Sequence, residues 1–423
     1  MSDSVSWPDS PEGGEIGDGK FARATHRPES VEDLCRIVAE ASAAGLAVYP
    51  RGGGTARDYG GVPRRPGVLV DVRSLDRVID YPHADMTITV QAGILMSTLK
   101  GILAEHNQRL LVDAPEADRA TLGGVFATNT SGPRRFGAGR PRDQIIGVEF
   151  VTADGKVVKG GGRVVKNVAG YDFPKLLTGS MGTLGILTQL TLKVRPAPET
   201  SAVVWAVTPS IVRILKALDG LNLSESRPMA IEFLNASAAR MIGEPLGLPA
   251  SAKDLVLAIG IEDNRESVRW QIERLKDELK EFDVSVREGD ASGPVWSGLT
   301  EFQAYRPGST TITANLPPSK VGDIVGDLDP DRWAVQAHAG NGIVRAHLLA
   351  DSDLESVAKE VDALRAEAVG RGGNLTVTRC QTEWKSRLKV WGEPRPDWRI
   401  AEGIRDTLDP RGVLNPGRFV GTI

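Results

Sequence analysis

The chain has 423 residues, of which 41% are hydrophobic and 25% charged, and its formal net charge is −4 at pH 7. This length exceeds that of one ordinary hydrophobic core, so we expect two or three domains. The arginines are spread along the chain and give no basic surface of the kind that binds nucleic acid. Cys35 and Cys380 are the two cysteines, far apart and without a CxxC pattern, which argues against a disulfide framework, a zinc site or an iron–sulfur cluster held by this chain.

Residues 1–20 are rich in Gly, Asp, Ser and Pro, and their composition predicts a flexible leader. They lack the basic start and the apolar core of a signal peptide. The longest apolar runs, such as Leu255–Ile259, are far too short to span a bilayer. We therefore expect a cytoplasmic protein that reaches a membrane only through a partner.

Residues 21–197 are predicted to form a mixed α/β domain dense in glycine. Ser30 is a candidate N-cap, and the apolar spacing behind it predicts a helix to about Gly45 with Cys35 in the core. A strand at 47–49 follows at once. The other elements expected in this domain are strands at 68–72, 86–90, 145–152 and 185–194 and a helix at 95–105.

Residues 198–378, after the turn-rich Arg195–Pro198, are predicted to form an α+β domain with helices between the strands of an antiparallel sheet. The order of elements repeats, which indicates two similar halves. The first half has strands expected at 202–207, 229–234, 254–261 and 283–288, with helices at 209–219 and 264–281. The second half has strands expected at 309–316, 333–338, 342–348 and 374–378, with a helix at 352–369.

Residues 379–423 are predicted to form a C-terminal segment with a helix at 397–407. The run Asp409-Pro410-Arg411-Gly412-Val413-Leu414-Asn415-Pro416-Gly417-Arg418 follows this helix. Its Asp-Pro and Asn-Pro-Gly steps are strong turn signals.

The segment Tyr49-Pro50-Arg51-Gly52-Gly53-Gly54-Thr55 is the most informative feature of the sequence. A strand that ends in three glycines leaves backbone N–H groups unpaired, and such groups can converge on an anion. A second glycine-rich stretch, from Thr121 to Gly132, follows later, and two such cradles suit a pyrophosphate. A plain tight turn is the alternative for the first segment taken alone.

The familiar nucleotide fingerprints are missing, because no GxxxxGK[ST] exists and no GxGxxG follows a strand. The stretch from Thr121 to Gly132 instead offers glycines together with small hydroxyl and amide donors that can close around a phosphate. Arg134 and Arg135 follow and can add positive charge. Further on, Val165-Lys166-Asn167-Val168-Ala169-Gly170-Tyr171-Asp172 leads to Gly179-Ser180-Met181-Gly182-Thr183-Leu184-Gly185-Ile186, whose glycines allow main chain to lie against a flat ring.

Taken in order, RGGGT, TLGG…NTSG, VKNVAGYD and GSxGTLGI resemble the FAD-binding domain of the vanillyl-alcohol-oxidase-type flavoproteins, also called PCMH domains. The tail DPRGVLNPGRF is similar to the C-terminal piece that returns to the flavin in that family. The resemblance implies an α+β protein, with a PCMH-type FAD-binding domain of two α/β subdomains, an antiparallel-sheet cap domain and a C-terminal segment that completes the flavin site. Within the family, VKNVAGYD…GSMGTLG is most similar to the E subunits, the FAD-binding subunits of glycolate oxidase complexes.

The resemblance also implies which residues hold FAD. The first loop would bind the pyrophosphate, the second stretch would wall the diphosphate and flavin, the GSMGTLGI segment would pack near the adenosine and ribityl parts, and the tail would return to the flavin ring. Thr55 stands where covalently flavinylated members often carry a His, and no Cys is near, which implies non-covalent FAD. The implied cofactor-binding residues are Pro50, Arg51, Gly52, Gly53, Gly54, Thr55, Pro115, Thr121, Gly123, Gly124, Thr128, Thr130, Ser131, Gly132, Gly182, Thr183, Ile186 and Asn415.

The chain departs from the catalytic 2-hydroxy-acid dehydrogenases of this family. Met181 stands where they carry a Glu. Their His-x-Gly-Asp-Gly-Asn-x-His motif, which holds a metal and the substrate carboxylate, corresponds here to the run from His338 to His347, with the second His displaced by two residues. No Glu-His-Gly run exists in the tail. The catalytic residues therefore stay unknown, and no metal site is predicted.

The run from His338 to His347 has two interpretations that the sequence leaves open. An Asn-Gly turn between two strands is a common hairpin signal. A metal or substrate site is the alternative, although firm metal binding needs three ligands and only two are evident. Arg345 is accordingly either a carboxylate ligand or an exposed strand arginine.

The resemblance implies an FAD-dependent oxidoreductase, namely the FAD-binding subunit of a glycolate oxidase-type complex that oxidises glycolate to glyoxylate. The expected partners are a sister flavin subunit and an iron–sulfur subunit, which would also carry any contact with the inner membrane. Because the His and Glu set is incomplete, we expect this chain to depend on the sister subunit for much of the substrate chemistry. The alternatives are a stand-alone dehydrogenase of another 2-hydroxy acid such as D-lactate and a non-catalytic structural subunit.

Overall fold

The computed structural model describes residues 12–162, 170–350, 352–421 and 423. The chain divides into two compact units. Unit 1 consists of Met1–Thr130, Arg140–Ala197 and Glu393–Ile423, and unit 2 consists of Ser131–Gly139 and Pro198–Gly392. The turn-rich segment Arg195–Pro198 thus contains one division between the units.

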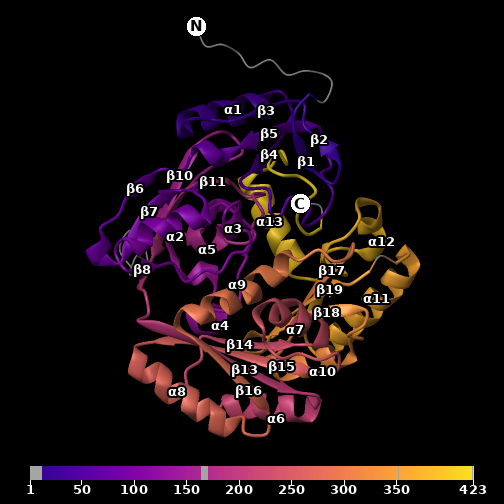
Figure 1. The fold of residues 1–423 in the computed structure, drawn as a ribbon. Coiled ribbons are helices and arrows are strands. Elements are labelled where there is room, and N and C mark those ends of the chain that lie inside the picture. The colour runs from indigo at the N-terminus through magenta and orange to yellow at the C-terminus, as the bar shows by residue number, and fades with distance from the viewer. Residues whose placement is uncertain (1–11, 163–169, 351, 422) are drawn as a thin grey trace. The chain divides into compact units, whose positions relative to one another are not determined.

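The first part of unit 1 is a three-stranded parallel sheet with a helix beside it (Figure 1). The strand order is β3-β5-β4, with β3 at Thr25–His26, β5 at Gly67–Asp71 and β4 at Ala47–Arg51. Helix α1 (Val31–Ala43) connects β3 to β4, and its apolar face packs on β4 and β5.

Helix α1 begins as the sequence predicts. The Ser30 hydroxyl accepts a hydrogen bond from the backbone N–H of Asp33 at 3.1 Å, which satisfies one of the free donors of the first turn. Cys35 is only partly buried and packs at the edge of the core, so the prediction of a core position holds in part.

The second part of unit 1 is a five-stranded antiparallel sheet with the order β10-β9-β11-β7-β6. Its strands are β6 (Val78–Asp80), β7 (Thr87–Gln91), β9 (Ile145–Val151), β10 (Val157–Gly161) and β11 (Ile186–Lys193). The helices of this part are α2 (Met96–Ala104), α3 (Leu122–Ala127) and α5 (Phe173–Leu177), and all three contribute side chains to one core with the sheet. Two further strands, β8 (Gln108–Arg109) and β12 (Arg195–Pro196), pair with each other.

The prediction of a flexible leader over residues 1–20 is wrong for its described part. Strand β1 (Glu15–Gly17) pairs with β2 (Lys20–Phe21). The reason is a small apolar cluster in which Ile16 and Ala22 pack with Tyr49 of β4. Residues 1–11 lie outside the described residues.

Of the predicted C-terminal segment 379–423, residues 393–423 belong to unit 1, whereas residues 379–392 belong to unit 2. After helix α13 (Trp398–Leu408), the Asp409 carboxylate accepts hydrogen bonds from the N–H groups of Val413 at 2.9 Å and Leu414 at 2.7 Å. Val48 of β4 then forms an isolated parallel bridge with Leu414. The final segment therefore extends the parallel sheet on the free side of β4.

Unit 2 is built on an eight-stranded antiparallel sheet with the order β16-β13-β15-β14-β18-β19-β17-β20. Its strands are β13 (Thr200–Thr208), β14 (Ala230–Leu234), β15 (Leu255–Asp263), β16 (Asp283–Glu288), β17 (Thr311–Asn315), β18 (Trp333–His338), β19 (Ile343–Leu348) and β20 (Asn374–Arg379). Strands β13–β16 form one half of the sheet, in the order 16-13-15-14. Strands β17–β20 form the other half, and read from the opposite edge of the sheet their order is 20-17-19-18, which is the same pattern. The prediction of two similar halves is thus confirmed by the topology.

Helices cover both faces of this sheet. Successive residues of a strand point to opposite faces, and here the strands carry apolar side chains on both of them. In β13, Val204 and Ala206 pack in the core that contains α6, α8, α10 and α11, whereas Val203 and Trp205 pack in the core that contains α7 and α9. Figure 1 shows α6 and α8 on one side of β13 and β15, and α7 and α9 on the other. The helices of unit 2 are α4 (Arg135–Ala138), α6 (Ile211–Leu221), α7 (Ala236–Gly243), α8 (Arg265–Glu278), α9 (Gly293–Glu301), α10 (Val321–Asp327), α11 (Leu354–Gly370) and α12 (Lys385–Leu388).

In the part of the chain that the structure describes, no helix combines the length and the apolar character needed to cross a membrane.

Candidate functional site

Unit 1 contains a cavity beside the carboxyl end of β4. The space within it, including the solvent at its mouth, is about 980 Å³. Segments far apart in the sequence line it, with residues drawn from 15–16, 49–57, 121–128, 181–187 and 415–418. The carboxyl ends of parallel strands are the usual place for ligands in α/β folds, so this cavity is the candidate site.

The glycine loop packs directly on the segment that leads into α3. A Cβ added to Gly52 would lie 2.0 Å from Oγ1 of Thr121, and one added to Gly53 would lie 1.7 Å from the carbonyl oxygen of Arg119. No side chain fits at either position. The first loop therefore meets the segment before α3 because Gly52 leaves room for the Thr121 side chain and Gly53 for the backbone of Arg119.

Within the second stretch, residues 122–127 form helix α3, which the sequence did not predict. The Thr121 hydroxyl caps this helix by accepting from the N–H of Gly124 at 3.3 Å, and the Thr128 hydroxyl donates to the carbonyl of Gly124 at 2.8 Å. Gly123 packs so closely that its Cβ would lie 2.8 Å from the Cβ of Ala92. The hydroxyls of Thr121 and Thr128 thus serve the helix itself.

The first loop supplies the unpaired donors. Within the described residues, the N–H groups of Gly52, Gly53 and Gly54 have no protein acceptor. Gly54 has a φ of +73°, and its Cβ position has no atom within 4 Å. Successive N–H groups around a left-handed residue form a concave anion site, so this loop is suited to a phosphate.

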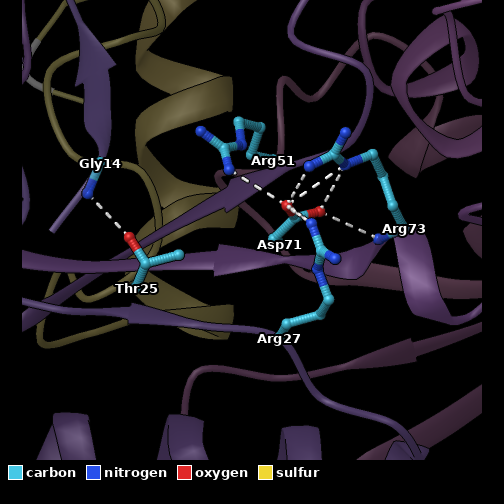
Figure 2. A network of polar contacts seen from close by, with 6 residues as sticks. All are labelled: Gly14, Thr25, Arg27, Arg51, Asp71 and Arg73. Atoms are coloured by element: carbon cyan, nitrogen blue, oxygen red, sulfur yellow. Dashed lines mark hydrogen bonds and ion pairs between the residues drawn. The ribbon is translucent and has the colours of Figure 1, made fainter.

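Arg51 adds a guanidinium to the lining of the cavity. Its Nη2 donates to Oδ2 of Asp71 at 3.0 Å, and the same carboxylate accepts from Arg27 at 3.1 Å and from Nη2 of Arg73 at 2.6 Å (Figure 2). Burial alone would raise the pKa of the Asp71 carboxyl, but hydrogen bonds from Arg73, Arg51 and Arg27 outweigh it and hold the pKa well below its usual range. Asp71 is therefore a carboxylate at neutral pH.

Another part of the lining combines the turn before β11 with the C-terminal segment. Nδ2 of Asn415 donates to the carbonyl of Met181 at 2.6 Å, and a Cβ on Gly182 would lie 2.9 Å from Cγ of Pro50. Met181 and Asn415 have φ values of +54° and +48°, although neither is glycine. Such strained residues persist where the surroundings hold them, and they often mark functional sites.

The structure brings most of the implied cofactor residues together around this cavity. Those that line it are Pro50, Arg51, Gly52, Gly53, Gly54, Thr55, Thr121, Gly123, Gly124, Thr128, Gly182, Ile186 and Asn415.

Five of the implied residues lie elsewhere. Pro115 lies in the bend before the turn at 116–119, and the Thr183 hydroxyl donates to the carbonyl of Ser180. The Thr130 hydroxyl bonds to that of Thr128 at 2.7 Å. Ser131 and Gly132 belong to unit 2, where they contact Arg135. The Val165–Ala169 part of the VKNVAGYD motif lies outside the described residues.

Sequence reasoning missed several residues that line the cavity. Glu15 was taken as part of a flexible leader, yet it pairs with Arg57 at 2.9 Å beside the glycine loop. Arg418 was seen only as a tail residue, yet it forms a buried ion pair with Asp18 at 2.5 Å. Neither pair has a local signal, because each joins residues that are distant in sequence. The other lining residues that were missed are Ile16, Tyr49, Ala56, Leu69, Val72, Ala127, Met181, Gly185 and Leu187.

In unit 2, His338 and His347 lie on a hairpin, which confirms that interpretation of the sequence. Strands β18 and β19 pair antiparallel through a short turn at Ala339–Asn341. His347 is fully buried, with Nδ1 3.0 Å from the Thr311 hydroxyl and Nε2 2.8 Å from the carbonyl oxygen of Phe302. Burial lowers the pKa of His347 to about 3, against the opposing effect of the hydrogen bond to Phe302. His347 is a neutral core residue.

His338 and Arg345 form part of a buried polar cluster. Nδ1 of His338 lies 2.7 Å from the Glu232 carboxylate, and its Nε2 lies 3.1 Å from Nη1 of Arg345. Because arginine can only donate, Nε2 accepts and Nδ1–H donates to Glu232. Arg345 is half-buried and also donates to the carbonyl of Ser131 at 3.1 Å, so its interpretation as an exposed strand arginine is wrong.

Arg134 and Arg135, which the sequence placed near a pyrophosphate, have partners within unit 2. Arg134 pairs with Glu262 at 2.8 Å and lies 3.9 Å above the ring of Trp296. Arg135 donates to the Ser131 hydroxyl at 3.1 Å. Among the described residues, no three His, Cys, Asp or Glu side chains are placed to hold a metal ion.

Two models of known protein families match the chain. The model described as FAD binding domain matches residues 22–161. The model described as FAD linked oxidases, C-terminal domain, matches residues 197–419, which is more than half of the chain. The protein belongs to the FAD-linked oxidases. It is thus an FAD-dependent oxidoreductase with FAD as its cofactor.

Two relatives show how far the similarity extends. The chain is 27% identical over 414 residues to glycolate oxidase subunit GlcD of Bacillus subtilis (strain 168), covering 93% of this chain and 87% of that protein. It is 26% identical over 419 residues to D-2-hydroxyglutarate dehydrogenase of Xanthomonas citri pv. viticola, covering 93% and 88% respectively.

The fold also matches that of a solved flavoprotein-family structure. p-Cresol methylhydroxylase with substrate bound superposes with a TM-score of 0.71 at 17% identity, covering 94% of this chain and 88% of the other. The expected PCMH-type fold is therefore confirmed.

The residues at the cavity fit FAD. The diphosphate needs clustered donors and positive charge, and the loop offers three unpaired N–H groups beside Arg51. The cavity also has an apolar side formed by Ile16, Leu69 and Ile186. The FAD-linked oxidase family and the chemistry of the site thus agree.

Proposed function

We propose that this protein is the FAD-binding subunit of a glycolate oxidase-type complex and that it oxidises glycolate to glyoxylate together with a sister flavin subunit. The observation that carries the proposal is the cavity at the glycine loop of Arg51–Thr55, in a chain that parallels glycolate oxidase subunit GlcD over 93% of its length. When bound, FAD supplies the acceptor for the hydride that leaves C2 of the substrate, while the hydroxyl proton goes to a base.

The proposed dependence on a sister subunit rests on the two histidines of unit 2. In His338 and His347 alike, both ring nitrogens are engaged by protein partners. A general base needs a nitrogen within hydrogen-bonding reach of the proton that it removes. Neither histidine offers one, which supports a role in flavin binding and electron transfer more than in proton abstraction.

The test is a dye-linked assay of the purified FAD-loaded chain with glycolate, alone and after reconstitution with the sister and iron–sulfur subunits. We expect little turnover by the chain alone and full turnover by the assembly. Full-rate oxidation by the isolated chain would contradict the division of labour. The same reconstitution tests the partners and, by fractionation with membranes, a cytoplasmic location at the inner membrane through those partners.

A second candidate is an independent FAD-linked dehydrogenase of another 2-hydroxy acid, such as D-lactate. The observation in its favour is that the similarity to D-2-hydroxyglutarate dehydrogenase, 26%, nearly equals that to GlcD, 27%. A panel of 2-hydroxy acids, read by bleaching of the flavin absorbance near 450 nm, separates the two. Rapid bleaching of the isolated chain by one acid other than glycolate would select the second candidate.

We also propose that FAD is held without a covalent bond. Among the described residues that line the cavity there is no His and no Cys, and Thr55 occupies the loop position considered above. Acid precipitation of the loaded protein should therefore leave the flavin in the supernatant. Yellow precipitated protein would refute this point.

A further inference from the structure

Each of the three parallel strands of unit 1 ends at a charged residue of one cluster. Arg27 follows β3, Arg51 is the last residue of β4, and Asp71 is the last residue of β5, in register with Arg51. Arg73 lies two residues after β5. Figure 2 shows the three guanidinium groups gathered around the single carboxylate of Asp71.

Asp71 is buried to 1% exposure, whereas the three arginine side chains keep 58%, 26% and 43% exposure in chain order. A buried carboxylate that accepts charge-assisted hydrogen bonds from three arginines is fixed in place. Arg51 is the least exposed of the arginines and lines the cavity. Within the described residues, Asp71 is its only recorded polar partner, so this one bond sets where its guanidinium points.

Charge sharing distinguishes Arg51 from the other cationic residues of the cavity. Arg57 pairs with Glu15 at 2.9 Å, and Arg418 pairs with Asp18 at 2.5 Å, each arginine having at least one carboxylate close by. The carboxylate of Asp71 is divided among three arginines. Two positive charges of this cluster therefore lack a compensating carboxylate, and the diphosphate of FAD carries two negative charges.

We propose that Asp71 is a positioning residue for the FAD diphosphate: it aims Arg51 at the cavity, while Arg27 and Arg73 compensate its charge so that the charge of Arg51 stays available. This inference rests on the proposed placement of the diphosphate at the glycine loop. It assigns a role in cofactor binding to three residues that have no contact with the cavity themselves. The carboxylate acts through Arg51.

The test compares FAD with riboflavin, which lacks the diphosphate, by quenching of flavin fluorescence on the apoprotein. Asp71→Asn keeps the shape and adds one net positive charge, so an effect of charge alone would tighten FAD binding. Loss of positioning instead weakens FAD binding by about tenfold or more, since a hydrogen bond to a charged group is worth about 1.5–3 kcal/mol. The dissociation constant of riboflavin should stay within about twofold, because no charge-assisted contact to it is lost.

Arg27→Gln and Arg73→Gln provide a second arm, because their side chains are about half exposed and the variants should fold. In each variant the Asp71 carboxylate has one arginine fewer to neutralise it, so it neutralises more of the positive charge of Arg51. The FAD affinity should therefore be about threefold lower than that of the wild type at low salt. The difference from the wild type should disappear when salt shortens the screening length to about 3 Å. Arg36→Gln is the matched control, with 43% side-chain exposure like Arg73 and partners confined to helix α1. It should leave both affinities unchanged.

The outcomes separate this inference from the placement on which it rests. Unchanged or tighter FAD binding by Asp71→Asn, or an equal loss for riboflavin, overturns the positioning role. Unchanged FAD binding by the Gly54→Ala variant described below overturns the placement of the diphosphate itself. Failure of Asp71→Asn to fold leaves the two arginine variants to decide, and equal affinities in these and in Arg36→Gln would refute the role.

Discussion

Substitution of Gly54 by alanine isolates the contribution of the glycine loop to cofactor binding. Gly54 has a φ of +73° and no atom within 4 Å of its Cβ position, so an added methyl group meets strain but no clash. Gly45, just after helix α1, has a φ of +71° and equally open surroundings. Only Gly54 lines the cavity. The two Gly→Ala variants thus share the backbone perturbation and differ in their distance from the ligand.

The expected effect on stability is the same for both variants. A left-handed backbone costs an alanine about 1–2 kcal/mol, and the stiffer unfolded chain returns about 0.4–1 kcal/mol. The unfolding free energy of each apoprotein, measured by urea titration, should therefore fall by about 1 kcal/mol.

The expected effect on FAD binding differs. At Gly54 the methyl group displaces the anion from the three unpaired N–H groups, and we expect the dissociation constant to rise about tenfold, equivalent to about 1.4 kcal/mol. At an FAD concentration about 100 times the wild-type dissociation constant, the stabilisation by FAD should drop from about 2.7 to about 1.4 kcal/mol. Gly45→Ala should keep the wild-type value.

Two results would refute this reasoning. If Gly54→Ala binds FAD as tightly as Gly45→Ala, the loop does not hold the diphosphate. If both variants lose FAD equally, the loss comes from strain in unit 1 and not from contact with the ligand.

Three further substitutions test other parts of the structure. His347→Gln removes a buried imidazole whose pKa is about 3, whereas the unfolded chain takes up the proton at about 6.5. As the pH falls from about 6.5 to about 3, the unfolding free energy of the wild type should therefore decrease by about 1.4 kcal/mol per pH unit. Urea titrations at several pH values should show a weaker dependence of the unfolding free energy on pH in the variant. Asp409→Asn weakens the bonds to the N–H groups of Val413 and Leu414, and should lower the unfolding free energy by about 2 kcal/mol and weaken FAD binding, whereas unchanged flavin affinity would show that the C-terminal segment is held by other contacts. Ser30→Ala should destabilise helix α1 by about 1 kcal/mol in thermal unfolding without affecting flavin titrations, and a change in flavin affinity would contradict the assignment of Ser30 to the cap alone.

The sequence predicts the regular elements with clear periodicity. Strand β13 and helix α8 appear within a few residues of their predicted bounds, because their apolar residues repeat at strand or helix spacing. Helices α3 and α9 were not predicted. Helix α3 contains Gly123 and Gly124, and α9 begins with Gly293-Pro294, so local composition suggests turns while tertiary packing of Val125 and Trp296 stabilises helices.

For the site, contiguous motifs were informative and dispersed clusters were not. Gly52 and Gly53 stand out in the sequence, and they are the residues that let the loop pack against the Thr121 side chain and the backbone of Arg119. Asp71 has no such signature, because its role arises only when three strand ends bring arginines from separate segments to one carboxylate. The family resemblance is enough to predict that the glycine loop binds the cofactor. The charged cluster around Asp71 can be found only from the three-dimensional structure.

The bridge between Val48 and Leu414 has a consequence for biosynthesis. The ribosome produces β4, the glycine loop and β5 early, but the residues that pair with the other edge of β4 emerge only after the whole of unit 2. Cofactor capture is therefore a late event, because the wall that contains Asn415 does not exist on a nascent chain. Pairings this distant in sequence form slowly. Until they form, the backbone N–H and C=O groups of Val48 on this edge of β4 lack their partners, and the supply of FAD during expression should influence the yield of folded protein.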